Sequence, residues 1–194
     1  MARIYCAGPI FNESERAEMA EIARVLEEAG HTTFLPHRDG LEFARLLPEL
    51  RMQGLDASSA DRVLLRSIFA LDVYQLLKAC DGVVANMNGR VPDEGTVVEA
   101  ALAWHAGKTL VLYKADSRSL LNGSDNPMLA GLCNFESLDE IAALPNAIAE
   151  QLGKSHGARV VEALSMGERI ARVRAESSSL VDLASVLAKH FEPA

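Results

Sequence analysis

The sequence predicts an α/β fold in which a doubly wound, five-stranded parallel sheet is sandwiched by helices, with an extra helical segment at the C-terminal end. Short β-like runs alternate with longer helical segments over most of the chain, which is typical of a parallel sheet covered on both faces. The run Val83-Val84-Ala85 is apolar without alternation, as expected for a strand buried on both faces. With 194 residues and 49% hydrophobic content, the chain can form one well-buried core.

Five strands are expected, and turn-forming residues mark several of their ends. Gly8-Pro9 follows the first strand and Pro36 stops the second, while the fifth has a weaker β pattern than the others. The predicted strands are residues 3–7, 32–35, 82–87, 109–113 and 133–135. A sheet of this kind is flavodoxin-like, and its ligand site is expected outside the carboxyl ends of the strands, where the strand order reverses.

Helices are expected between the strands. The first opens near Asn12 or Ser14, both good N-caps, and stops at Gly30. The predicted helical segments are residues 12–29, 41–52, 63–80, 94–106, 127–131 and 138–152. The last part of the chain is amphipathic and helical. We therefore expect an α/β domain over residues 1–153 and a helical extension over residues 154–194.

Composition narrows the classes of partner and cofactor. The net charge of −8 repels phosphate polymers, so no nucleic-acid partner is expected. The three widely spaced cysteines and the five histidines lack metal-site spacing, and neither a GxGxxG nor a Walker pattern is found, so neither metal nor cofactor is expected. Because no apolar run approaches ~18 residues, we expect a cytoplasmic protein with no membrane partner.

Glu99 lies among residues that do not explain its charge. Within the predicted helix 94–106, the positions three and four residues away hold Gly95, Thr96, Leu102 and Ala103. This row is small or apolar and contains no cation, so the carboxylate is either partly desolvated or directed into a cleft. The alternative is an exposed Glu at the edge of the helix.

Asp72 interrupts an aliphatic row. Together with Leu64, Ile68 and Leu76 it follows the four-residue spacing of one helix face. Because burying a carboxylate without a partner is costly, we expect Asp72 to be hydrogen-bonded or to face a ligand. The alternative is a boundary residue bonded to a neighbouring loop.

Three more polar residues lie close to the expected strand ends. Tyr5 is mid-strand, where its hydroxyl needs a partner, in the core or in a site. Asp93 directly precedes a helix and can cap its free N–H groups, a position that is also the rim of the expected site. Asn126 precedes Pro127 and is expected in an extended loop conformation.

Taken together, these segments resemble the nucleoside 2-deoxyribosyltransferase family over about residues 2–150. The matching pieces are residues 4–11 (IYCAGPIF), Asp72, residues 79–85 (ACDGVVA), residues 92–99 (PDEGTVVE) and residues 126–128 (NPM). The block 93–108, with an acid, then Gly-Thr, then a Glu six residues after the acid, is fairly specific. The segment beyond about residue 155 is not part of the family's common core.

The resemblance implies a two-step exchange of the nucleobase on a deoxyribonucleoside, without a cofactor. It implies that Glu99 is the nucleophile, that Tyr5 orients it, and that Asp93 holds the sugar hydroxyls. Asp72 is similar to the carboxyl group that meets the nucleobase. The implied substrates are a small nucleoside and a free nucleobase.

The resemblance also implies further substrate-binding positions. These positions are Gly8, Phe11, Asn126 and Met128. Asn126 and Met128 would reach into a neighbouring subunit's site, so the implied active unit is a homo-oligomer, at least a dimer.

The residues themselves support this chemistry, because a carboxylate can stabilise the oxocarbenium character of a sugar and collapse onto its anomeric carbon. One alternative is a hydrolase of 2′-deoxynucleoside 5′-monophosphates, for which Arg38, Lys114 and Arg118 are the available cations. Asn126, where a phosphate-binding relative would more often show Ser, favours free nucleosides. A second alternative is a non-catalytic nucleotide-ligand sensor, which would not need Glu99.

Overall fold

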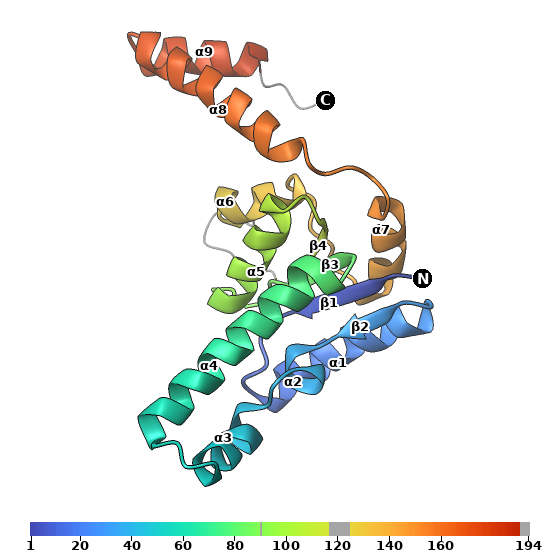
Figure 1. Cartoon of the computed structure of the whole chain (residues 1–194). Coiled ribbons are helices and arrows are strands. Elements are labelled where there is room, and N and C mark those ends of the chain that lie inside the picture. Colours follow the sequence, from blue (N-terminus) through green and yellow to red (C-terminus); the bar gives the residue numbers. More distant parts are fainter. Residues whose placement is uncertain (90, 117–124, 191–194) are drawn as a thin grey trace. The chain divides into compact units, whose positions relative to one another are not determined.

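The computed structural model describes residues 1–89, 91–116 and 125–190 of the chain. The chain divides into two compact units, Met1–His156 and Gly157–Ala194. The first unit is an α/β domain and the second is a pair of helices, and each is described separately (Figure 1).

A parallel sheet forms the centre of the first unit, with the strand order β2-β1-β3-β4. Its strands are β1 (Arg3–Ala7), β2 (Thr32–Phe34), β3 (Gly82–Asn86) and β4 (Thr109–Tyr113). These four predicted strands are confirmed. The chain moves from β1 outward to β2 and then crosses to β3 on the other side of β1, so the strand order reverses between β1 and β3.

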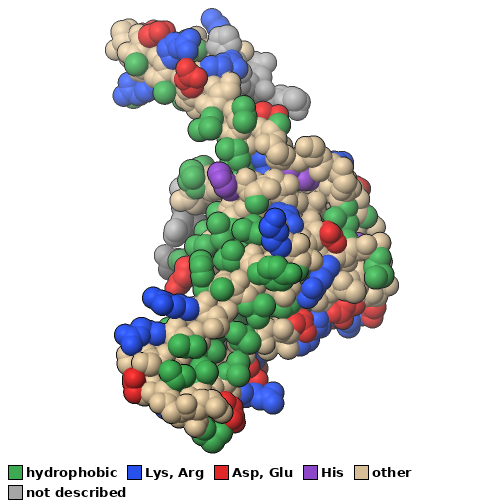
Figure 2. Space-filling model, viewed as in Figure 1, with side chains coloured by type: hydrophobic (Ala, Val, Ile, Leu, Met, Phe, Trp, Pro, Cys, Tyr) green, Lys and Arg blue, Asp and Glu red, His purple; other side chains and the backbone are tan. Residues whose placement is uncertain are grey.

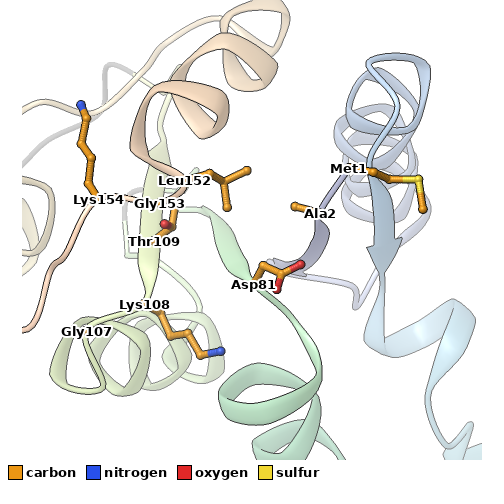
Figure 3. A pocket seen from close by; sticks show the side chains of 9 residues that line it. All are labelled: Met1, Ala2, Asp81, Gly107, Lys108, Thr109, Leu152, Gly153 and Lys154. Carbon is orange, nitrogen blue, oxygen red and sulfur yellow. The ribbon is translucent and has the colours of Figure 1, made fainter.

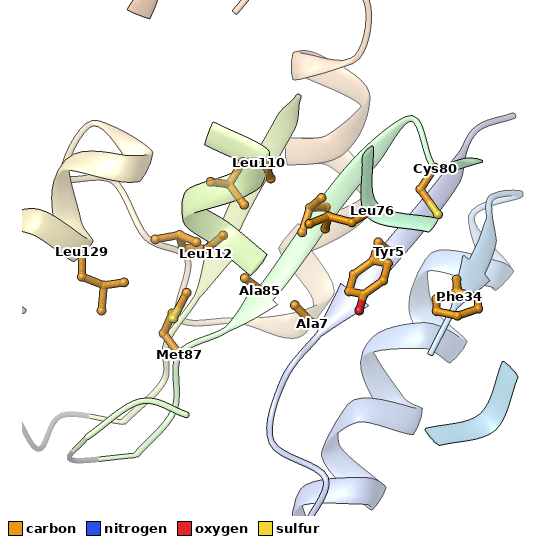
Figure 4. Packing of buried hydrophobic residues seen from close by; sticks show 13 residues of the cluster. Tyr5, Ala7, Phe34, Leu76, Cys80, Ala85, Met87, Leu110, Leu112 and Leu129 are labelled. Carbon is orange, nitrogen blue, oxygen red and sulfur yellow. The ribbon is translucent and has the colours of Figure 1, made fainter. Parts of the chain in front are cut away.

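Helices cover both faces of this sheet, and the alternation along β1 decides which residue meets which face. Ile4 and Cys6 pack in the cluster formed with α1 (Glu13–Glu28) and α7 (Leu144–Gln151). Tyr5 and Ala7 point the opposite way, into the cluster formed with α5 (Glu94–His105). Figure 4 shows both side chains within that cluster. The predicted N-cap Asn12 is confirmed, because its side chain accepts from Glu15 in a capping box.

The long connection between β2 and β3 is helical almost throughout. It contains α2 (Pro36–Asp39), α3 (Phe43–Met52) and α4 (Ala57–Tyr74), and α3 packs against α4. The predicted helices 41–52 and 63–80 are found here, but α4 begins six residues earlier than expected because Asp56 caps it at Ser59. Its end widens into the π-helical turn η1 (Gln75–Ala79), where the Cys80 N–H donates to the Gln75 carbonyl at 2.9 Å.

The predicted fifth strand at residues 133–135 is wrong. The chain there forms η2 (Gly131–Cys133), a 3-10 turn that follows α6 (Pro127–Ala130). Asn134 and Phe135 then take positive φ angles of 55° and 66°, which no strand accommodates. Only a single bridge pairs Tyr113 with Leu138 beside β4. The described residues of the sheet therefore form four strands instead of five.

The predicted helix 138–152 also begins later than expected. Leu138 is held in the bridge to β4, where its N–H donates to the Leu112 carbonyl at 2.9 Å. Helical structure starts only with η3 (Ile141–Ala143), which leads into α7. The backbone groups of Leu138 are thus committed to the sheet, so they are not available to a helix.

The second unit contains α8 (Arg159–Glu176) and α9 (Leu180–His190), which contact each other. No residue of α8 is buried. None of the helices in the described part of the chain is both long enough and apolar enough to cross a membrane.

Gly8 offers a test of the packing at the carboxyl end of β1. A Cβ atom on Gly8 would lie 2.1 Å from Met19 Sδ and 3.1 Å from Asn86 Cβ. Gly8→Ala is therefore expected to lower the free energy of unfolding by about 1–3 kcal/mol, as measured by chemical denaturation. Gly131→Ala is the control, because that residue has φ −63° and no described atom within 4 Å of a new Cβ. Equal stabilities of the two variants would contradict this packing.

Candidate active site

The candidate site is built around a hydrogen bond between the sheet and a helix. Tyr5 is fully buried in β1, and its hydroxyl donates to Glu99 Oε1 at 2.5 Å. Its ring packs beside Phe34 with centroids 5.5 Å apart, and the cluster around it is apolar (Figure 4). The hydroxyl is therefore held in one place by the core, and it presents a fixed donor to the carboxylate.

Glu99 is supplied by the middle of α5. Ala100 and Ala103 bury the sheet side of this helix, and their small size lets the helix lie close to the strands. Asp93 caps the helix: its Oδ2 accepts from the Thr96 N–H at 2.7 Å and from Thr96 Oγ1 at 2.9 Å. The cap-forming interpretation of Asp93 is thus confirmed. It fixes the start of the helix that carries Glu99.

Asp72 and Glu99 both line one hollow, which has a volume of about 290 Å³. Asp72 lies in the last turns of α4 and Glu99 lies in α5, so these two helices form two sides of the hollow. Most of its remaining wall is hydrophobic, and hydrophobic side chains gather on this face of the domain (Figure 2). The other lining residues are Phe69, Val73, Leu76, Glu94, Gly95, Val98 and Leu102. A flat, uncharged ring of nucleobase size suits such a wall.

The surroundings of Glu99 disfavour its charge. Burial raises the pKa of this carboxyl to about 7, and the negative charges of Asp72 and Asp93 add to the rise. The hydrogen bond from Tyr5 acts in the opposite direction and lowers the pKa. The Glu99 carboxyl therefore changes charge near neutral pH, so a nearby proton donor or positive charge can shift its ionisation.

The pKa values of Asp72 and Tyr5 are raised as well. Burial raises the pKa of Asp72 to about 6. Burial, followed by the charge of Glu99, raises the pKa of Tyr5 far above its usual value, so the hydroxyl stays protonated and can only donate to Glu99 while that carboxyl is ionised. Two carboxyl groups that titrate near neutrality in one hollow can act as a nucleophile and an acid.

The other residues expected in the site lie outside this hollow. Gly8 packs between Met19 and Asn86, and Phe11 is 77% exposed. Asn126 caps α6, accepting from the Met128 N–H at 2.9 Å. Met128 itself is 83% exposed. Arg118 lies outside the described residues.

The apolar wall was not identified from the sequence. Phe69 and Val73 on α4, with Val98 on α5, are exposed or half-exposed helix positions of a kind that many surfaces show. The available signal was their spacing, because Phe69 lies three residues before Asp72, and Leu102 lies three residues after Glu99. Only the fold, which places α4 and α5 on two sides of one hollow, joins these separate positions into one wall.

A second hollow, of larger volume, lies elsewhere among the described residues of the first unit and is lined by different residues. It has a volume of about 570 Å³ and lies at the amino ends of the strands, next to Ala2, Asp81 and Thr109 (Figure 3). The ammonium of Lys108 at its edge donates to the Cys80 carbonyl at 2.6 Å. Because ligands of such sheets bind at the carboxyl ends, this hollow is the weaker candidate. Among the described residues, no group of three or more His, Cys, Asp or Glu side chains is placed to hold a metal ion.

Comparisons with known proteins find one family model and solved structures of similar fold. A sequence model described as "Nucleoside 2-deoxyribosyltransferase" matches residues 4–166. A solved structure of a conserved protein from Enterococcus faecalis V583 is similar, with a TM-score of 0.58 and 20% identity, covering 78% of this chain and 99% of that one. A 2-deoxyribosyltransferase from Bacillus psychrosaccharolyticus is also similar, with a TM-score of 0.52 and 23% identity, covering 75% of this chain and 91% of that one. Among curated proteins, no sequence matches the chain.

The raised pKa of Glu99 predicts a pH-dependent stability effect. Between pH 4.5 and about 7 the folded protein keeps a proton on Glu99 that the unfolded chain has released, so this group lowers stability as the pH rises through that window. Glu99→Gln removes the penalty and keeps an acceptor for Tyr5. We expect the variant to be more stable than the parent at pH 8, by up to about 3 kcal/mol, and the gain to vanish near pH 4.

Thermal or chemical denaturation at both pH values measures this difference. Glu150→Gln, on the exposed side of α7, is the matched control and is expected to change stability by less than about 0.5 kcal/mol. A Glu99→Gln variant that is less stable than the parent at pH 8 would show that the carboxylate stabilises the fold.

Proposed function

Because the chain belongs to the nucleoside 2-deoxyribosyltransferase family, we propose that it exchanges the nucleobase of a 2′-deoxyribonucleoside through a glycosyl-Glu99 intermediate. The observation that supports this most directly is the 2.5 Å hydrogen bond from Tyr5 to Glu99 beside a hollow shared with Asp72. This geometry provides an oriented carboxylate next to a second carboxyl group, in a mostly apolar surrounding.

In the first step, an oxygen of Glu99 attacks C1′ of the sugar. A C1′–O bond forms while the C1′–N bond breaks, and the electron pair of that bond leaves with the nucleobase. Tyr5 donates to Oε1, which leaves Oε2 as the attacking atom. As positive charge develops on the sugar, the carboxylate becomes better stabilised than it was in the empty hollow, so the interaction favours the transition state over the ground state.

Asp72 supplies the proton in this proposal. The departing base nitrogen takes a proton from the neutral Asp72 carboxyl, which a pKa of about 6 keeps partly protonated near neutral pH. In the second step a new base attacks C1′, returns a proton to Asp72 and releases the Glu99 carboxylate. Asp93, at the start of the same helix, is the residue we assign to the sugar hydroxyls.

We assign the further substrate contacts to residues outside the hollow, and some of these to a second chain. Asn126 and Met128 lie at the start of α6, and Met128 is almost fully exposed, so both are available to a neighbouring subunit. Gly8 and Phe11 closely follow β1, so they lie at the edge of the sheet where the carboxyl ends of the strands are found. The proposed active unit is therefore a homo-oligomer of at least two chains.

The hydrolysis of a 5′-monophosphate is the second candidate, and the two described cations of the three named for it, Arg38 and Lys114, argue against it. Arg38 pairs with Glu27 at 3.0 Å and with Asp39 at 2.9 Å. Lys114 pairs with Asp125 at 2.9 Å, and its side chain is only 7% exposed. A phosphate would have to displace carboxylates that already hold these groups. A non-catalytic sensor would not need a carboxylate oriented as Glu99 is by Tyr5.

Incubation with deoxyinosine and adenine tests the proposal. Formation of deoxyadenosine, measured by chromatography of the products, is expected from the parent protein and from Glu150→Gln. Glu99→Gln is expected to lose the activity by at least about 10³-fold, because the amide cannot form the glycosyl ester. Hypoxanthine release without deoxyadenosine would indicate a hydrolase. No turnover of nucleosides or of nucleotides would favour the sensor.

The two perturbed carboxyl groups predict a bell-shaped dependence of kcat/KM on pH. Exchange requires an ionised Glu99 and a protonated Asp72. Because Asp72 has the lower pKa of the two, this is the less populated of the two singly protonated forms, and its population is highest between about pH 6 and about pH 7, where activity is expected to peak. Asp72→Asn removes the acid and also the negative charge that helps to raise the pKa of Glu99. The remaining activity should then rise with pH to a plateau with a single pKa below about 7, while kcat falls by about 10² or more. A bell that survives this substitution would exclude Asp72 as the acid.

A further inference from the structure

The Lys114 side chain joins three segments at the carboxyl end of the sheet. Lys114 directly follows β4, and its ammonium pairs with Asp125 Oδ1 at 2.9 Å. The same ammonium donates to the carbonyls of Met87 at 3.2 Å and Gly89 at 3.4 Å, both in the loop after β3. With its side chain 7% exposed, Lys114 is a buried cation with all three partners provided by the protein.

Asn88 provides a second connection between the loop after β3 and the segment after β4. Its Oδ1 accepts from the backbone N–H groups of Ala115 and Asp116 at 2.8 and 3.0 Å, and its Nδ2 donates to Glu18 on α1 at 2.7 Å. The Gly89 N–H returns a bond to Asp116 Oδ2 at 3.1 Å. The loop is therefore fixed from both sides, and Lys114 is the member of this network that reaches Asp125.

The two segments that Lys114 joins lead to residues of the proposed site. The loop after β3 ends at Asp93, the cap of α5. Asp125 directly precedes Asn126, the cap of α6, and α6 is too short at four residues to fix its own position. Asn126 accepts from Met128 with its side chain, so the two residues move together.

We propose that Lys114 is a positioning residue for nucleoside binding: by clamping Asp125 to the loop after β3, it sets the place from which Asn126 and Met128 reach their substrate. The inference rests on the proposed function. It assigns to Lys114 a role different from phosphate binding. Because Lys114 does not touch Glu99 or Asp72, its effect falls on substrate binding and leaves the bond-breaking step largely intact.

Lys114→Met tests this inference, because it keeps the length of the side chain and removes the ammonium. We expect the KM for the donor nucleoside to rise about tenfold while kcat changes by less than about threefold. Lys114→Arg retains the positive charge and several donors, and it should recover most of the lost affinity. Lys154→Met, at an exposed position, is the matched control and should behave as the parent protein does.

Hydrogen exchange of the backbone amides provides a readout that does not depend on turnover. In Lys114→Met, faster exchange is expected for the amides of Ala115, Asp116 and Met128, whose acceptors belong to the clamped segments, with unchanged exchange in β1 and β3. A uniform increase across the domain would indicate general destabilisation instead of lost positioning, and would overturn the inference. If Lys114→Met does not fold, Asp125→Asn, which keeps an acceptor oxygen, is judged by the same criteria.

The outcomes separate the two proposals. If the parent protein does not exchange the nucleobase, the proposed function is wrong, and so is the role of Lys114 in nucleoside binding. If the parent protein exchanges the nucleobase and Lys114→Met has an unchanged KM, only the inference about Lys114 is overturned. A fall in kcat at constant KM would also overturn it, because it would place Lys114 in the chemical step.

Discussion

The hydrogen bond between Tyr5 and Glu99 is the constraint on which the candidate site depends. It crosses from the central strand to the covering helix, so its geometry requires that β1 turn Tyr5 toward α5. A shift of β1 by one residue would turn Tyr5 to the α1 side and replace it with Ile4 or Cys6. Pairing with β2 and β3 on both sides prevents this shift. The site is therefore a property of the sheet as much as of its loops.

Much of the fold followed from local signals. Four strands, the cap at Asn12 and the cap at Asp93 were predicted because each depends on residues close together in sequence. Glu99 and Asp72 drew notice because each breaks the pattern of its helix, and breaks of this kind gather where function outweighs stability. Their common hollow agrees with that interpretation, while the roles assigned to them are still proposals.

The parts that sequence did not predict depend on contacts between distant segments. The prediction of a fifth strand is wrong because Asn134 and Phe135 adopt left-handed conformations. Neither residue is a glycine, which would have indicated a turn. The partners of Lys114 are carbonyls and a carboxylate supplied by other segments, so its sequence neighbours give no hint of them. In the sequence, Lys114 is only one of the cations close to a strand end.

The π-helical turn η1 sets the rotation of α4 about its own axis. A turn of this kind accommodates one residue more than an α-helical turn, and each residue of a helix advances it by about 100°. Removing a single residue from Gln75–Ala79 would therefore leave the strands in place and swing Asp72 a quarter of a circle away from Glu99. Length variation at this one junction can separate the two acids in a relative without altering either of them.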